Sequence, residues 1–278
     1  MPATVQAALL GIVQGLTEFL PVSSSAHLIL ARAFFGFDAD RFGLAFDVAC
    51  HVGTLVAVVI YFRRELGQMI AAIPRLMDAG RDDNARLIWL LVIGTLPAVA
   101  AGLLFKREIE GSLRTPLVAA TALVLGSVLF FVAERRGAKT RSDRTLTLSE
   151  ALWIGCAQAV ALIPGVSRSG VTIAVALLLG LRRPDAARFI FLLAVPAILG
   201  AAASEGPHLL KAGMGGETAT LFAIGIVTSA VVGYAAVKFL IRYLTTHSLD
   251  VFAWYRLALA AAAFVWVFRN VTHAVATP

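Results

Sequence analysis

Two short polar segments carry the residues of this chain that could do chemistry, and the segments are near copies of each other. Residues 14–27 read QGLTEFLPVSSSAH, and residues 158–172 read QAVALIPGVSRSGVT. A shift of 144 positions (158 minus 14) superposes Gly11 on Gly155, Gln14 on Gln158, Ser23 on Ser167 and Ser25 on Ser169. The sequence around both is apolar, and polar groups within a membrane are costly. The duplication therefore indicates a function.

The first segment places an amide one helical turn before a carboxylate. Gln14 and Glu18 are four residues apart, so they share one face of a helix. Their oxygens could hold a divalent metal, with waters and substrate oxygens completing the coordination. The alternative is a buried hydrogen-bonded pair that only tightens helix packing.

Three serines follow Pro21 and indicate the start of a new helix. Ser23, Ser24 and Ser25 could cap its free backbone N–H groups, and the same helix end attracts anions. His27 lies three residues after Ser24 and on the same face. A hydroxyl and an imidazole within reach of each other suit nucleophilic catalysis, with His27 as base or as nucleophile.

The second segment adds a fixed cation, Arg168, among the hydroxyls of Ser167, Ser169 and Thr172. A guanidinium in an apolar stretch needs an anionic partner, and its donors match phosphate oxygens. The alternative is an ion pair between Arg168 and Glu18 that holds the two segments together, and the two roles are compatible. Acid, hydroxyl, imidazole and arginine together suit phosphoryl chemistry, in which positioning and charge neutralisation dominate.

These residues must be positioned by membrane helices. The chain has 278 residues, of which 59% are hydrophobic and 15% charged, and its mean hydropathy is +0.84. This composition indicates an all-α polytopic membrane protein, because a crossing needs ~20 apolar helical residues. The sequence predicts six crossings, at 44–62, 87–105, 116–133, 187–204, 218–241 and 251–269.

Two further apolar regions, 3–36 and 147–181, are broken by Pro21 and by Pro164-Gly165. Each is too short for two crossings, so each is predicted to form a re-entrant helical hairpin. Three crossings between the hairpins make them enter from opposite faces. We therefore expect a single membrane domain, 1–278, with a first repeat at 1–136 and a second, inverted repeat at 147–278.

The basic loops orient this arrangement. With both termini outside, the inner loops 63–86, 134–149, 182–188 and 242–250 hold most of the arginines that give the net charge of +7. This bias predicts a multi-pass protein of the bacterial inner membrane whose site opens to the outer, periplasmic face. It also favours anionic lipid, rather than nucleic acid, as the partner of the basic loops.

Four other polar residues of the crossings have weaker signals. Asp47 and His51 are one helical turn apart and could line the cavity or pair with each other. Lys238 and Arg242 lie near the end of their crossing and are expected to extend to the membrane interface.

The two segments resemble the motifs of the undecaprenyl-diphosphate phosphatase family, membrane phosphatases associated with bacitracin resistance. The family's (E/Q)xxxE element, followed by Pro-x-Ser-Ser-(Ser/Thr)-x-His, matches residues 14–27, and its Pro-Gly-x-Ser-Arg-Ser-Gly-x-Thr motif matches 164–172. The hydropathy is similar to that of the family from end to end.

The resemblance implies that the chain removes the terminal phosphate of undecaprenyl diphosphate, giving undecaprenyl phosphate and inorganic phosphate. It also implies dependence on a divalent cation, Mg²⁺ or Ca²⁺. Glu18 would be the metal-associated acid, Ser24 and His27 the candidate nucleophile or base, and Arg168 the diphosphate clamp. Gln14 stands where some relatives have glutamate, so the metal affinity of this chain is expected to differ.

The implied partners are the polyprenyl diphosphate substrate and the membrane lipids, with a homodimer as one arrangement of the chain. Ser23, Ser25, Ser167, Ser169 and Thr172 are the expected substrate-binding hydroxyls. The main alternative is a polyprenyl-phosphate flippase or another secondary transporter, because inverted repeats with broken helices are typical of transporters.

Overall fold

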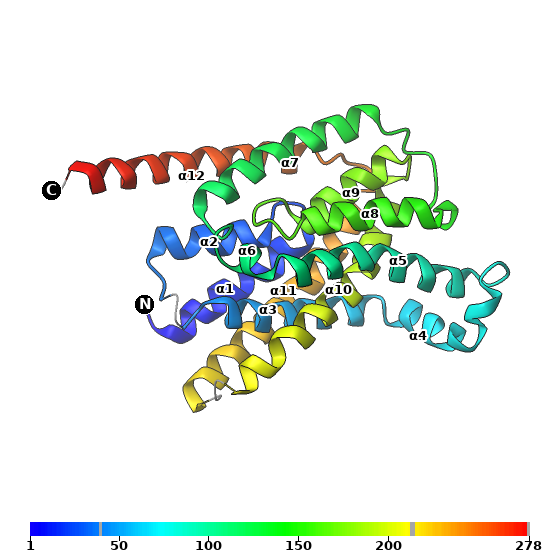
Figure 1. Cartoon of the computed structure of the whole chain (residues 1–278), viewed down its shortest axis with the longest axis horizontal. Coiled ribbons are helices and arrows are strands. Elements are labelled where there is room, and N and C mark those ends of the chain that lie inside the picture. The colour runs from blue at the N-terminus through cyan, green and yellow to red at the C-terminus, as the bar shows by residue number, and fades with distance from the viewer. Residues whose placement is uncertain (39–40, 212–214, 277–278) are drawn as a thin grey trace.

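The structure, a computed structural model, describes residues 1–38, 41–211 and 215–276, and within these residues it is helical without any strand (Figure 1). The helices of the first half are α1 Ala3–Phe19, α2 Ser24–Phe35, α3 Leu44–Tyr61, α4 Arg63–Ala72, the 3₁₀ helix η1 Ile73–Asp78, α5 Asp83–Leu104, α6 Lys106–Glu110 and α7 Pro116–Arg136. Those of the second half are the 3₁₀ helix η2 Asp143–Thr145, α8 Leu148–Val160, α9 Arg168–Leu178, α10 Arg183–Lys211, α11 Gly216–Tyr243 and α12 Asp250–Ala276.

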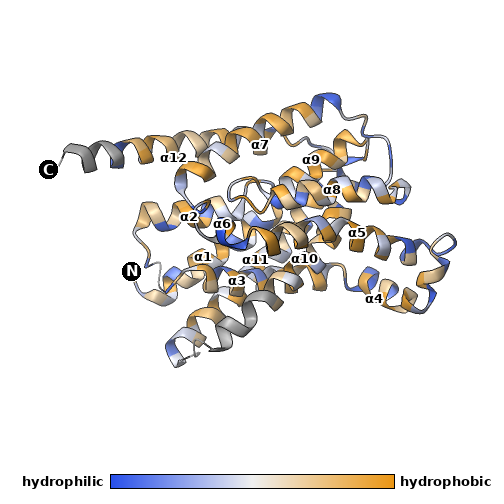
Figure 2. Ribbon diagram, in the orientation of Figure 1, coloured by the Kyte–Doolittle hydropathy of each residue, from blue (hydrophilic) through white to orange (hydrophobic). Residues whose placement is uncertain are grey.

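Six of the described helices are long and apolar enough to cross a membrane: α3, α5, α7, α10 over Arg183–Ala203, α11, and α12 over Asp250–Asn270. They coincide with the six predicted crossings, so that prediction is confirmed. Figure 2 shows apolar residues along most of each ribbon and polar residues gathered at the turns, notably around α4 and after α7. The loop predicted at 63–86 is largely helical, because α4 and η1 continue the chain beyond α3.

Both predicted helix breaks are present. α1 ends at Phe19 and α2 begins at Ser24, whereas α8 ends at Val160 and α9 begins at Arg168. The inverted relation of the repeats, their boundaries and the re-entry of the helix pairs into a membrane stay predictions.

The residues just before α2 and α9 have the same unusual backbone. Ser23 and Ser167 each have φ of 75°, a value that few non-glycine residues adopt. Each hydroxyl caps its helix by accepting a hydrogen bond from the backbone N–H three residues later. The capping role expected for the serines of the first segment is confirmed at Ser23, and Ser167 has the same role in the second segment. The shared strain marks these breaks as candidate functional sites.

Small residues let the broken helices pack closely against crossings of the other half. α1 lies against α11, and α8 lies against α5. A Cβ on Gly11 would come within 2.8 Å of the Gly225 carbonyl, and a Cβ on Gly155 within 2.5 Å of the Gly94 carbonyl. Each half therefore holds the broken helix of the other.

Two crossing helices flank this arrangement. α7 and α12 lie side by side along one edge of the molecule, and α7 also packs against α2 and α9 (Figure 1). The starts of α2 and α9 are thereby brought together in the interior, where the site is found.

Candidate active site

The carboxylate of Glu18 is the centre of the site. Its side chain, near the end of α1, is only 4% exposed. Oε1 accepts a hydrogen bond from Nη2 of Arg168, and Oε2 accepts from Ser24 Oγ at 2.7 Å and from Gln14 Nε2 at 2.9 Å. Nε2 of His51 lies 3.4 Å from the same oxygen. Residues of α1, α2, α3 and α9 therefore meet at one buried acid.

The ion pair of Arg168 with Glu18 joins the two polar segments, as the sequence allowed. The bond to Glu18 uses Nη2, and a guanidinium carries five N–H donors, so others can bind phosphate oxygens. The Arg168 side chain is 22% exposed, so a ligand can reach it. Acid and cation share one site.

Two further hydrogen bonds connect the breaks. Ser25 Oγ accepts from the N–H of Gly165 at 3.2 Å, and Ser169 Oγ donates to the carbonyl of Leu20 at 3.4 Å. Ser25 and Ser169 are equivalent under the 144-residue shift (169 minus 25), so the contacts are reciprocal. These two serines hold the segments together.

The remaining predicted hydroxyls are engaged with nearby backbone and with each other. Ser23 and Ser167 are the helix caps, and each also lies within hydrogen-bond distance of the serine two positions later. Thr172 donates to the carbonyl of Arg168 at 2.5 Å. They shape the site, and their contact with substrate stays a prediction.

His27 is not oriented as the sequence predicted. Its Nδ1 lies 2.7 Å from the carbonyl of Ser23, and its Nε2 lies 2.7 Å from the hydroxyl of Tyr255 on α12. The two rings stack, with centroids 5.6 Å apart. No hydrogen bond among the described residues joins His27 to Ser24, so the expected Ser24–His27 contact is wrong. The spacing of three residues put both on one face, but Tyr255 draws the imidazole towards α12.

His51 takes the place expected of His27 beside the acid. It approaches Glu18 from α3, and its Nδ1 bonds the carbonyl of Asp47 at 2.8 Å, which fixes the ring. Sequence reasoning considered His51 only as a lining residue or as a partner of Asp47. The sequence did show a histidine within a predicted crossing. The separation of His51 and Glu18 in the chain, however, did not indicate that the two side chains are in contact.

Of the two roles that the sequence left open for Asp47 and His51, pairing of their side chains is the one that the contacts of Asp47 contradict. The Asp47 carboxylate bonds Arg32 of α2 and Nη2 of Arg114, the latter at 2.7 Å. Asp47 therefore forms ion pairs with one arginine in the last turn of α2 and one just before α7, and it leaves the His51 imidazole free to face Glu18.

The donor set around Glu18 fits a divalent cation that completes its coordination with substrate oxygens. Gln14 Oε1 is buried without a hydrogen-bond partner, while its Nε2 faces Glu18. If the amide were turned around, its oxygen would face the carboxylate oxygen and no hydrogen bond could form. Gln14 Oε1 therefore lacks a partner because Nε2 makes the bond to Glu18. The described residues offer no cluster of three His, Cys, Asp or Glu side chains, so substrate oxygens and waters would have to supply most ligands of a cation here.

Arg256 is a second buried cation that sequence reasoning missed. Its guanidinium, fully buried on α12, contacts the ring of Phe130 at 4.9 Å and donates to backbone carbonyls of both breaks and of α7. The acceptors are Pro21 at 3.4 Å, Gly165 and Val166 at 3.1 Å, Ala122 at 3.2 Å and Leu123 at 3.3 Å. Arg256 thus fixes both polar segments to one helix. The sequence did contain a signal for this role, because Arg256 is a charged residue within the predicted crossing 251–269.

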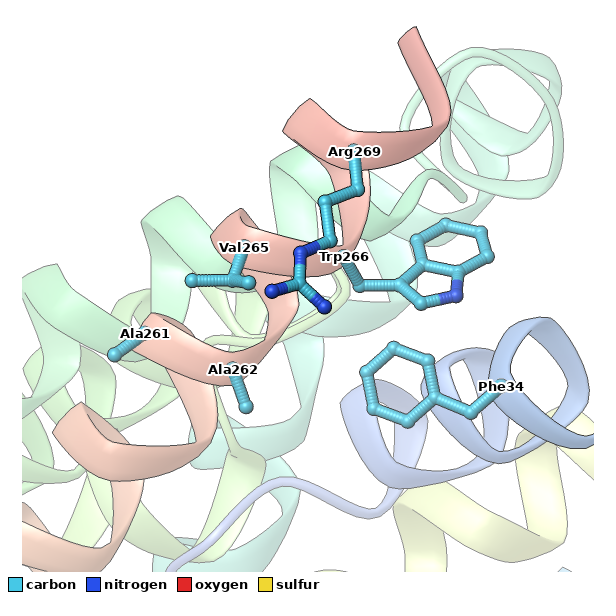
Figure 3. A pocket seen from close by; sticks show the side chains of 6 residues that line it. All are labelled: Phe34, Ala261, Ala262, Val265, Trp266 and Arg269. Atoms are coloured by element: carbon cyan, nitrogen blue, oxygen red, sulfur yellow. The ribbon is translucent and has the colours of Figure 1, made fainter. Parts of the chain in front are cut away.

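A shallow apolar groove lies away from this acid, between the ends of α2 and α12 (Figure 3). It has a volume of about 450 Å³, with the rings of Phe34 and Trp266 beside each other and Arg269 among its lining residues. The groove suits an apolar chain.

The chain is similar to known proteins over most of its length. Residues 7–262 match the family model described as bacitracin resistance protein BacA. The chain is 52% identical to an undecaprenyl-diphosphatase of Rubrobacter xylanophilus, over 92% of this chain and 96% of the relative. It is 47% identical to undecaprenyl-diphosphatase 2 of Stutzerimonas stutzeri (94% and 97% covered) and 44% identical to an undecaprenyl-diphosphatase of Teredinibacter turnerae (95% and 99%). The chain therefore belongs to the bacitracin resistance protein BacA family.

Proposed function

We propose that this chain removes the terminal phosphate of undecaprenyl diphosphate and releases undecaprenyl phosphate and inorganic phosphate, which recycles the lipid carrier for cell-wall synthesis. One observation carries the proposal: Glu18 accepts hydrogen bonds both from Ser24 of its own segment and from Arg168 of the other. A hydroxyl beside a carboxylate and a guanidinium suits attack on phosphorus. The names of the relatives support the substrate.

Ser24 is the nucleophile in this mechanism. Its Oγ forms a bond to the terminal phosphorus, the bond from that phosphorus to the bridging oxygen breaks, and the Ser24 proton passes to Glu18. Undecaprenyl phosphate leaves with the bridging oxygen, and water then hydrolyses the phosphoserine to release inorganic phosphate. Arg168 neutralises the transferred group, because phosphoryl transfer depends on positioning and charge. Water attacking directly, with Glu18 as its base, is the alternative route.

A divalent cation, Mg²⁺ or Ca²⁺, would be held by Gln14 Oε1 and Glu18 together with phosphate oxygens. When bound, it supplies positive charge that neutralises the diphosphate. The closeness of the Gln14 amide to the Glu18 carboxylate supports this assignment, with the amide turned so that Oε1 faces the cation. Arg168 bonds Glu18 through Nη2, and its other N–H donors would bind the substrate phosphate.

The site would open to the outer face of the bacterial inner membrane, and the positive-inside bias of the loops supports this orientation. The polyprenyl tail would lie among the helices in contact with lipid. The groove of Figure 3 supports such a path, since Phe34 is seven residues, or about 10 Å of helix, beyond His27. A homodimer stays a prediction.

The test is phosphate release by the purified full chain in detergent. Wild type should release phosphate from undecaprenyl diphosphate and stop when a chelator is added. Ser24→Ala should lose activity by at least about a hundredfold, the lower range for loss of a positioned catalytic group. Thr121→Ala, an exposed hydroxyl of α7 that bonds only its own helix, is the control.

One outcome would contradict the proposed reaction, and another would contradict only the proposed nucleophile. A folded wild type that transports the lipid without releasing phosphate would favour the flippase reading. Full activity of Ser24→Ala, with no phosphoserine trapped in wild type, would instead favour attack by water.

A further inference from the structure

One face of α11, near its end, combines cations with aromatic rings. Lys238 and Arg242 are one turn apart and form a cationic stripe, and Phe239, Tyr243 and His247 form an aromatic stripe beside it. The two stripes line a groove of about 470 Å³. None of these residues belongs to the polar segments of the catalytic site.

The cationic stripe has no acidic partner in the described parts of the chain. Three other arginines near the same end of the molecule are neutralised: Arg182 pairs with Asp185, Arg183 with Glu134, and Arg188 with Glu65 and Asp143. Lys238 and Arg242 are exposed and make no ion pair with any described carboxylate. Lys238 and Arg242 can therefore be neutralised by an anion from outside the protein.

The aromatic stripe is a rigid wall. The rings of Phe239 and Tyr243 have centroids 5.5 Å apart, and those of Tyr243 and His247 lie 4.4 Å apart, nearly parallel. An edge contact with Phe252 of α12 holds Tyr243 from behind. Aromatic groups in such positions are typical of membrane interfaces, where one side of the ring meets hydrocarbon.

An apolar track leads from this groove towards the start of α11. Val227, Val231, Ala235 and Phe239 recur every four residues, and the two valines are 60% and 67% exposed. Twelve residues of helix cover about 18 Å, which exceeds half of a hydrocarbon core of ~30 Å. The track is therefore as long as one leaflet is deep.

We propose that this face of α11 binds an anionic glycerophospholipid. Lys238 and Arg242 contact its phosphodiester and acidic headgroup, and one acyl chain lies along the track from Phe239 to Val227. The lipid comes from the leaflet on the side of the 244–249 turn, which is the side of the basic loops. The combination of two unpaired cations with a leaflet-long apolar track distinguishes a lipid from a free anion.

The test compares lipid binding by the purified full chain, measured by native mass spectrometry with phosphatidylglycerol and with phosphatidylcholine. The test variant carries Lys238→Gln and Arg242→Gln together. The control variant carries Arg64→Gln and Arg81→Gln, which remove two exposed charges of the same end that make no ion pair with the described carboxylates. We expect wild type and control to prefer phosphatidylglycerol, and the test variant to lose that preference by about thirtyfold, the factor for two interfacial cations.

Three results would overturn the proposal. An unchanged preference in the test variant would exclude the groove, and an equal loss in both variants would indicate general surface charge. Displacement of phosphatidylglycerol by inorganic phosphate would indicate a free-anion site. Each single substitution is measured as well, with an expected loss of about fivefold, so that the result does not depend on the folding of the double variant.

Discussion

The guanidinium of Arg168 on α9 donates to the carboxylate of Glu18 on α1, so the cation of one polar segment is held by the acid of the other. The pair does more than hold two helices together, because Glu18 also accepts a hydrogen bond from Ser24. Substrate phosphate would compete with Glu18 for Arg168. The pair therefore links substrate binding to the state of the acid.

Two substitutions of Arg168 distinguish its role in substrate binding from its role in folding. Arg168→Gln should lower kcat/KM by at least about a hundredfold, because it removes the charge that neutralises the diphosphate and leaves Glu18 buried without it. Arg168→Lys keeps the charge but loses the forked donors, so it should retain more activity than Arg168→Gln. Phosphate release and thermal unfolding are measured on both. Equal activity of the two variants would contradict a charge-based role.

Replacing His51 should lower activity more than replacing His27, whereas the sequence predicted His27 to be the catalytic histidine. His51→Asn should lower kcat by about tenfold or more, because His51 lies beside the Glu18 carboxylate. His27→Phe keeps a ring against Tyr255 and should cost less, since its hydrogen bonds go to Tyr255 and to backbone. Steady-state kinetics of both variants decide the order. A larger loss for His27→Phe would restore His27 as the catalytic imidazole.

The six crossings and both helix breaks could be predicted because they depend on local sequence. Apolar length defines the crossings, and Pro21 and Pro164 with the following serines define the breaks. The contact of Glu18 with Arg168 could be named as one alternative, because a buried charge of each sign needs a partner.

The orientation of His27 and the place of His51 could not be predicted, because they depend on tertiary contacts. Tyr255 is 228 residues from His27 in the chain, and His51 reaches Glu18 only through the packing of α3 against α1. Helical spacing gives the face on which a side chain lies, but not which neighbouring helix it contacts.

Arg256 should be the most sensitive residue for stability outside the catalytic groups. Arg256→Leu would leave the carbonyls of Pro21, Gly165 and Val166 without this donor, and an unsatisfied buried group costs about 1–3 kcal/mol. We expect a clear loss of thermal stability in detergent, by about 3 kcal/mol or more, together with loss of activity.

Gly126 provides an independent check on Arg256, because a Cβ at this position would come within 2.0 Å of its Nη2. Gly126→Ala should therefore displace the guanidinium and reproduce part of the loss. The neighbouring Leu125, which is 66% exposed, serves as the matched control through Leu125→Ala. If Gly126→Ala unfolded no earlier than Leu125→Ala, the carbonyl contacts of Arg256 would not be stabilising.

Gln14→Glu tests the proposed cation site by adding charge instead of removing it. The Gln14 amide lies beside Glu18, with its Nε2 2.9 Å from Oε2, and a second carboxylate in its place would strengthen binding of a divalent cation by adding a full negative charge. Without the cation, two adjacent carboxylates repel, so the variant should be less stable in chelator than wild type. We expect the Mg²⁺ concentration for half-maximal phosphate release to fall, and Mg²⁺ to raise the unfolding temperature of the variant more than that of wild type. The unfolding measurement does not depend on activity. An unchanged response to Mg²⁺ in both measurements would place the cation away from Gln14.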